Sequence, residues 1–152
     1  MIANSARVVV ADTDRTVLEL LQIRLELAGY RVFVCRGGDE LIDMTKVARP
    51  TAMVLDLNLS GLGASVVLDQ LRRKNLLNFP FLLMGKNMTP ESLQEALRLG
   101  ARSCIVKPFS GADVVERVNW MMRTPPQGPA PILAPISASG PPPRRPSVYL
   151  DA

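Results

Sequence analysis

Charged residues that could do chemistry stand at the ends of short apolar runs in this sequence. Asp12, Asp56 and Lys107 each occupy such a position, and Gly85 occupies the corresponding position of a further run. Ligands of open parallel sheets bind outside the carboxyl ends of the strands, where the strand order reverses. If the runs are parallel strands, two carboxylates and one ammonium therefore converge on one crevice.

The composition argues against several other site chemistries. The 152 residues contain no histidine, which excludes His-based catalysis. The two cysteines, Cys35 and Cys104, form no CxxC pair, so a zinc site is not expected. The formal charge of +4 comes without a dense basic run. It therefore indicates a solvated surface and does not imply a nucleic-acid partner.

The elements that would position the charged residues follow from an alternation of apolar runs with amphipathic stretches. The predicted strands lie at residues 6–11, 30–35, 52–57, 79–84 and 103–106. Between them apolar residues recur at helical spacing, as at Val17, Leu21 and Leu25 in the first of five helices. Gly29 and Gly100 end the first and fourth helices. Near-continuous apolar strands predict a parallel sheet covered by helices on both faces, the α/β class.

The sequence predicts one folded domain followed by a tail. The domain is expected at residues 1–123, and nine of the 13 prolines lie in the segment 124–152 after it. Such a segment cannot bury enough surface to offset its ordering entropy, so it is expected to be disordered and partly polyproline II. No apolar run reaches the length of a membrane span or of a secretion signal, so we expect a cytoplasmic protein without a membrane partner.

The sequence resembles the receiver domain of two-component response regulators over nearly all of residues 1–123. The segments that carry the resemblance are VVVADTD, VLDLNLSGLGA and GARSCIVKPF. It implies a flavodoxin-like, doubly wound sheet of five parallel strands in the order 2-1-3-4-5 with five helices. It also implies a signalling protein of a phosphorelay, not an enzyme.

The resemblance assigns a role to each matching residue. Asp56 matches the carboxylate that accepts a phosphoryl group from a phosphohistidine. Asp12, Asp56 and the backbone carbonyl of Asn58 match ligands of Mg²⁺. Lys107 matches the lysine that bridges to the phosphoryl group, and its peptide bond to Pro108 is cis in most family members. The physical reading agrees, because a carboxylate can accept a phosphoryl group only where a hard cation and an ammonium neutralise the gathered negative charge.

The first departure from the family pattern is at Thr13. The family has two adjacent carboxylates where this chain has Asp12 and Thr13, and the missing one is a direct magnesium ligand. A neutral hydroxyl is a poor substitute for an oxygen anion, so Mg²⁺ is expected to bind weakly or not at all. Asp14 could compensate, but we expect it to cap the first helix.

Both switch positions of the family have also changed. Gly85 stands where a Thr or Ser follows the phosphoryl group, and Cys104 replaces the switch aromatic. The hydrogen bond that such a hydroxyl makes to a charged group contributes ~1.5–3 kcal/mol, whereas inverting a two-state switch from 1:99 to 99:1 takes ~5.5 kcal/mol. The loss of the hydroxyl at Gly85 is therefore expected to remove a substantial part of the coupling between phosphorylation and the switch. Cys104 is expected to be a small buried hydrophobe, without a disulfide to Cys35, because the strand order places their strands at opposite edges.

The loops around the site depart as well. Lys86 replaces a small residue, so it could crowd the pocket or add a second cation there. Ser60 replaces the usual proline, and Gly63 and Ala64 replace the usual Asp-Gly pair. These changes favour the hypothesis that Asp56 is phosphorylated poorly or not at all, and that the domain acts mainly as a protein-binding platform.

A different class of protein matches one segment. The run DTDRTV resembles the nucleophile motif of haloacid dehalogenase-type phosphatases, with Asp12 as nucleophile, Asp14 as acid/base and Lys107 as the conserved lysine. The match is local, because Gly85 lacks the hydroxyl that this family requires and its later acidic loop is missing.

The expected partners are proteins. The resemblance implies a histidine kinase or phosphotransfer protein and a downstream target, and no nucleic acid, because nothing after Arg123 can fold as a helix-turn-helix. The chain is therefore expected to act as a stand-alone receiver. The face of the fourth helix, fifth strand and fifth helix could present Leu99, Trp120 and Met121 to a partner, although apolar residues at these spacings more often belong to the core. The tail offers the segments PPPRRP and VYLDA.

Overall fold

This computed structural model describes residues 6–124, in which five strands alternate with five helices. The elements are β1 (Arg7–Ala11), α1 (Arg15–Leu27), β2 (Arg31–Cys35), α2 (Gly38–Ala48), β3 (Ala52–Asp56), α3 (Ala64–Arg73), β4 (Phe81–Gly85), α4 (Pro90–Leu99), β5 (Ser103–Val106) and α5 (Gly111–Arg123). The predicted five β/α units are confirmed.

The strands form one parallel sheet in the order β2-β1-β3-β4-β5, as predicted. The chain moves outward from β1 to β2, then returns to β3 and builds toward the other edge. The order therefore reverses beside β1 and β3, and the region at the carboxyl ends of these strands, where open parallel sheets bind their ligands, is called the crevice below. Asp12 directly follows β1 and Asp56 ends β3, so both stand at this crevice.

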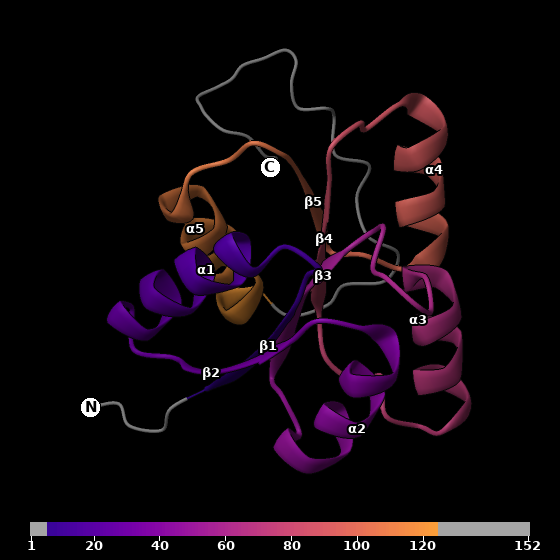
Figure 1. The fold of residues 1–152 in the computed structure, drawn as a ribbon, viewed down its shortest axis with the longest axis horizontal. Helices are drawn as coiled ribbons and strands as arrows, with labels where there is room; N and C mark the ends of the chain where they lie inside the picture. The colour runs from indigo at the N-terminus through magenta and orange to yellow at the C-terminus, as the bar shows by residue number, and fades with distance from the viewer. Residues whose placement is uncertain (1–5, 125–152) are drawn as a thin grey trace.

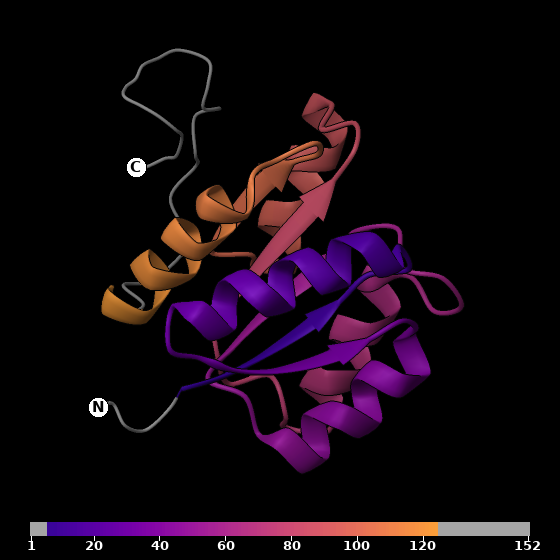
Figure 2. The ribbon, with the colours of Figure 1, turned by 60° about the vertical axis from the view of Figure 1, so that its left-hand side comes forward.

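Helices cover the sheet on both faces (Figures 1 and 2). Side chains of a strand alternate between the two faces. Val8 and Val10 of β1 accordingly pack in the cluster formed with α1 and α5. Val9 and Ala11 pack in the opposite cluster, formed with α2, α3 and α4. This double coverage explains why the strands are apolar throughout.

The helix boundaries follow from capping residues. The Asp14 side chain accepts from Thr16 N at the start of α1, as expected. Thr89 caps α4 ahead of Pro90, and Gly100 ends that helix with a φ of 93°, in the left-handed region that glycine adopts most easily. A cap of this kind contributes about 1 kcal/mol.

The fourth strand begins two residues later than predicted. The expected run covered residues 79–84, whereas β4 spans Phe81–Gly85. Pro80 has no N–H for a ladder hydrogen bond, and only its carbonyl is used, by Met53 N at 3.1 Å. At its other end the strand includes Gly85, which places that residue at the crevice.

The predicted tail, residues 124–152, lies outside the described residues except for Thr124. Thr124 follows α5, and its N–H donates to Trp120 O. No helix within residues 6–124 is long and apolar enough to cross a membrane.

Candidate functional site

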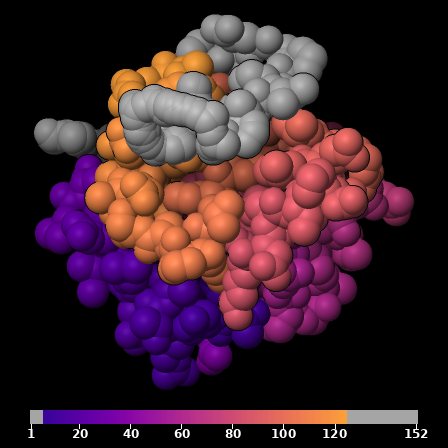
Figure 3. Space-filling view, turned by 90° about the horizontal axis from the view of Figure 1, so that it is seen from above, coloured from indigo at the N-terminus to yellow at the C-terminus, as the bar shows by residue number. Residues whose placement is uncertain are grey.

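The three charged residues singled out in the sequence meet at the crevice. Lys107, which follows β5, donates from Nζ to Asp12 Oδ2 at 2.7 Å and to Asp56 Oδ2 at 3.4 Å. The three come from positions up to 95 residues apart in the chain. Figure 3 looks onto the edge of the molecule where the strands end, with the β4–α4 and β5–α5 segments side by side. The predicted convergence of two carboxylates and one ammonium is observed.

Both carboxylates are buried and held by backbone N–H groups. Asp12 is 1% exposed and Asp56 is 7% exposed. Asp12 Oδ1 accepts from Asp14 N at 2.8 Å, and Asp56 Oδ1 accepts from Asn58 N at 3.3 Å. A buried charge is costly unless it is paired and hydrogen-bonded, so these contacts and Lys107 together make the burial possible.

The shifted pKa values of Asp56 and Lys107 reflect the cost of burying these charges. Burial raises the pKa of Asp56, and the nearby charge of Asp12 raises it further, against the opposing effects of Asn58 N–H and Lys107. Burial alone would lower the pKa of Lys107, but the hydrogen bond to Asp12 and the charges of Asp56 and Asp12 outweigh it and raise that pKa. Two carboxylates and one ammonium leave a formal charge of −1 in the crevice.

The donor set fits a Mg²⁺ ion only in part. Mg²⁺ requires oxygen ligands in near-octahedral geometry and is held in proteins by one or two carboxylates, waters and phosphate oxygens. Asp12 and Asp56 supply two carboxylates, but Lys107 already binds an oxygen of each. Within residues 6–124 no group of three or more His, Cys, Asp or Glu side chains is placed to hold a metal ion.

Thr13 has a partner of its own in the next loop. Its Oγ1 accepts from Ser60 N at 3.1 Å, and its carbonyl accepts from the Arg36 guanidinium at 3.3 Å. Ser60 Oγ in turn donates to Arg36 O at 3.3 Å. A proline at position 60 could not donate this N–H, so the contact with Thr13 requires a residue other than proline there.

These contacts link the loops that follow β1, β2 and β3, and we refer to Thr13, Arg36 and Ser60 as the loop clasp. In the sequence, Thr13 and Ser60 stand out only as departures from the family pattern, and Arg36 was not predicted to contact them. The available signal was the non-proline residue at position 60, which frees a backbone N–H beside the site.

The space beside Gly85 is filled by a different residue. A Cβ at position 85 would lie 3.1 Å from Met88 Sδ, closer than nearly all real Cβ contacts, and 3.8 Å from Leu57 Cδ2. A methionine thioether therefore occupies the region where the family carries its switch hydroxyl. A residue with a Cβ at position 85 would therefore require Met88 to shift.

The two cysteines are free thiols, as expected. Burial raises the pKa of Cys35 to about 12 and that of Cys104 to about 11. Both thiols are thus protonated at neutral pH and poor nucleophiles. Arg117 of α5 donates to Cys104 O and to Ser103 Oγ, each at 2.7 Å. These hydrogen bonds join α5 to the part of β5 where the family carries its switch aromatic.

The structure shows where several neighbouring residues lie. Lys86 is exposed. Leu99 and Met121 are buried at 4% and 2% exposure and pack in the two cores, so core packing, the more common role for apolar residues at this spacing, is what the structure shows. Trp120 is half-buried, with Arg102 stacked on its ring at 5.2 Å.

Two further residues complete the site. The peptide bond between Lys107 and Pro108 is cis. Asn58 is exposed, with its backbone N–H committed to Asp56. The Asp14 carboxylate caps α1 by accepting from Thr16 N, a structural role different from the acid/base that the phosphatase hypothesis assigns to it.

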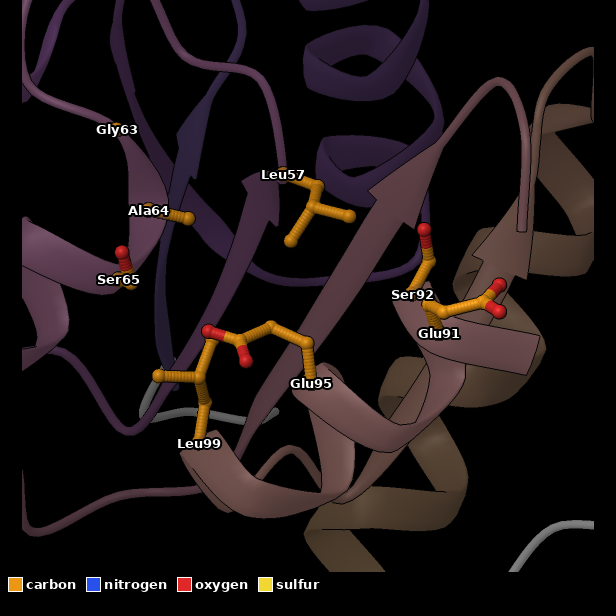
Figure 4. Close-up of a pocket in the computed structure, with 8 residues that line it drawn as sticks. All are labelled: Leu57, Gly63, Ala64, Ser65, Glu91, Ser92, Glu95 and Leu99. Carbon is orange, nitrogen blue, oxygen red and sulfur yellow. The ribbon is translucent and has the colours of Figure 1, made fainter. Parts of the chain in front are cut away.

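A groove of about 290 Å³ lies next to the site, between α3 and α4 (Figure 4). Leu57, the residue after Asp56, and Leu99 supply its apolar surface, and Glu95 reaches across from α4 toward α3. Ligand pockets for small molecules span ~300–1,000 Å³, so this groove is at the lower limit of that range. It is a shallow neighbour of the site, with no added charge partner for Asp56.

Comparisons with known proteins agree with this architecture. The family model for the response regulator receiver domain matches residues 8–119. The PhoP transcriptional regulatory protein of alkaline phosphatase synthesis in Bacillus subtilis is 32% identical over 117 residues, covering 77% of this chain and 48% of that protein. PrrA of Mycobacterium tuberculosis is 33% identical over 119 residues, covering 78% and 51%. The chain spans about half the length of these relatives.

Solved structures give the same result at the level of the fold. The chemotaxis response regulator CheY4 of Vibrio cholerae superposes with a TM-score of 0.73 at 24% identity, covering 78% of this chain and 99% of that one. The receiver domain of the Francisella response regulator 1452 superposes with a TM-score of 0.72 at 25% identity, covering 78% and 98%. With the family model matching most of the sequence, this chain belongs to the response regulator receiver family.

Proposed function

We propose that this chain is a stand-alone receiver protein that acts through protein–protein interaction, with Asp56 as an impaired phosphoacceptor. The observation that carries the proposal is the position of Lys107 Nζ, 3.4 Å from Asp56 Oδ2 and 2.7 Å from Asp12 Oδ2. One ammonium in contact with both carboxylates could stabilise a phosphoryl group on Asp56, because such catalysis depends on positioning and charge neutralisation. No enzymatic turnover of the chain's own is part of this function.

The impairment follows from the charge count at the crevice. With a carboxylate at position 13 the formal charge would be −2, and with Thr13 it is −1, which weakens the attraction for a divalent cation. Lys107 also competes for the oxygens that a cation would use. When bound, Mg²⁺ would neutralise charge on the transferring phosphoryl group, and Asp12, Asp56 and Asn58 O are the residues that would hold it.

The second candidate is a receiver that works without phosphorylation. The loop clasp favours it, since Thr13, Arg36 and Ser60 join three loops of the site through hydrogen bonds alone. The filled space beside Gly85 also favours it. In a receiver of this second kind, Asp56 is not phosphorylated, and the parent chain and Asp56→Asn bind the target with the same affinity.

The proposed partners are a histidine kinase or phosphotransfer protein and one downstream protein target, met in the cytoplasm. On the face formed by α4, β5 and α5, Val106 is 49% exposed and is the apolar residue that we propose for target contact. The Pro-rich composition of residues 124–152 argues against a folded nucleic-acid-binding unit within that segment.

The test is labelling of Asp56 with a small phosphodonor, acetyl phosphate, in the presence and absence of Mg²⁺. Intact mass before and after incubation measures the phosphorylated fraction, with Asp56→Asn as the control that cannot be labelled. Slow, incomplete labelling with weak dependence on Mg²⁺ is expected. Rapid, stoichiometric and strictly Mg²⁺-dependent labelling would rule out the impairment, and equal labelling of Asp56→Asn would rule out Asp56.

A further inference from the structure

An apolar stripe is exposed on the outer face of α1. Of the six large apolar side chains exposed within residues 6–124, three lie on this helix: Leu20 at 37%, Ile23 at 58% and Leu27 at 79%. Their spacing of three and four residues places them on one face of the helix. The opposite face of α1, with Leu18, Leu21 and Leu25, is already buried in the core. The helix is therefore apolar on two sides, and only one side is covered by the domain.

The chain leaves the described domain beside one end of this stripe. α1 and α5 lie next to each other and run in the same general direction (Figures 1 and 2). The Tyr30 hydroxyl, three residues after Leu27, donates to Asn119 Oδ1 in α5. Thr124, which directly follows α5, is thus near the Leu27 end of α1.

The segment that follows Thr124 contains matching apolar residues. Its sequence PPQGPAPILAPI brings Ile132, Leu133 and Ile136 within twelve residues of Thr124. The eight residues from Thr124 to Ile132 can span up to ~25 Å in polyproline II. The stripe itself, seven residues of helix, is ~10 Å long. The segment can reach it easily, and a short tether of this kind gives an effective concentration on the order of millimolar.

We propose that the segment 130–136 of this chain packs on the α1 stripe in cis. Residues three apart lie on one face of a polyproline II helix, at ~9 Å. Leu133 and Ile136 therefore match the ~10 Å separation of Leu20 and Leu27, with Ile23 between them. Prolines at positions 131 and 135 favour that extended conformation before docking and so reduce the entropic cost. The docked segment covers the apolar face of α1 that the domain leaves in solvent.

The experiment places a nitroxide label next to the segment in the full chain. Ser137→Cys provides the attachment site, because Cys35 is buried, Cys104 is partly buried, and both thiols have raised pKa values. Paramagnetic broadening of backbone amides is then compared between α1 and α2. The parent chain is expected to show the strongest broadening around Ile23. The variant Ile23→Lys is expected to lower the ratio of docked to free segment about tenfold or more, since it removes one buried apolar anchor.

The control is Val47→Lys, which changes another exposed apolar residue, 81% exposed on α2 across the sheet, and is expected to leave the pattern intact. A mixed sample separates docking in cis from docking in trans. In it, the isotope-labelled chains that are observed carry no nitroxide, and the nitroxide is on chains without isotope label. Broadening in that mixed sample would mean that a second copy supplies the segment and would overturn the proposal. The proposal would also be overturned if the broadening were centred on the α3–α4 groove or were spread evenly over the domain. It would likewise be overturned if Ile23→Lys left the broadening unchanged.

Discussion

At the scale of single residues, Lys107 decides whether the site is stable. It is the cation that Asp12 and Asp56 share, and its side chain is only 12% exposed. Removing one member of a buried ion pair leaves an uncompensated charge, which is far more costly than losing an exposed pair. The Lys107 contacts proposed to support phosphorylation of Asp56 are therefore also needed to keep two carboxylates in the core.

The variant Lys107→Met is expected to lower the free energy of unfolding at pH 7 by roughly 3 kcal/mol, because Asp12 and Asp56 are left facing each other. Urea titration followed by circular dichroism measures the change. Lys86→Met is the matched control, since Lys86 is exposed, and a change within about 0.5 kcal/mol is expected. Equal effects of the two variants would show that Lys107 is not the neutralising cation.

Asp56→Asn is expected to act in the opposite direction. The folded state raises the pKa of Asp56 through burial and through Asp12, so the ionised form destabilises the fold at neutral pH. Replacing it with a neutral isostere should raise the free energy of unfolding by roughly 1 kcal/mol or more at pH 7. The gain should shrink as the pH falls through the raised pKa, because the parent chain then protonates Asp56. Unfolding curves at pH 7 and pH 4.5 check the sign, and a gain that grows toward acid pH contradicts it.

At the scale of elements, the start of α2 and the loop after β3 fit closely together. A Cβ at Gly38 would lie 2.6 Å from Leu62 Cβ and 2.9 Å from Leu62 O. The neighbouring Gly37 forms a bridge with Ser60, the member of the loop clasp that follows β3. The position of this loop, and with it the surroundings of Asp56, therefore depends on the absence of a side chain at position 38.

Gly38→Ala is accordingly expected to destabilise the domain by about 1–3 kcal/mol, since a new methyl group must displace backbone in a packed region. Gly37→Ser is the matched control. Its Cβ would meet Ser60 O at an ordinary 3.7 Å, and a serine at this helix N-cap should be neutral or slightly stabilising. Thermal unfolding of both variants decides the point. If Gly38→Ala melts with the parent chain, the loop is not held as described.

At the scale of the whole molecule, the fold could be predicted because its signals are local and repeated. Five apolar runs, helical spacing between them and capping residues such as Asp14 and Gly100 specify a doubly wound sheet without long-range information. The convergence of Asp12, Asp56 and Lys107 followed from the topology, because strand ends of a parallel sheet share one edge. The predicted strand order is confirmed.

Other features depend on contacts that no local pattern encodes. The bond from Ser60 N to Thr13 joins residues 47 positions apart, and the space beside Gly85 is filled by Met88 of the loop between β4 and α4. The burial of Leu99 and Met121 likewise depends on how far α4 and α5 rotate toward the sheet. Side-chain packing between separate elements determines these contacts and this burial.

The central claim, that this receiver site has too few oxygen anions to hold Mg²⁺ firmly, is tested most directly by calorimetric titration of Mg²⁺ into the parent chain, Thr13→Asp and Thr13→Asn. Thr13→Asn controls for shape without adding charge. We expect weak binding by the parent chain and by Thr13→Asn, and binding about tenfold tighter or more by Thr13→Asp, since one added charge near the ion contributes at least about 1.4 kcal/mol. Tight binding by the parent chain, unchanged in Thr13→Asp, would contradict the claim.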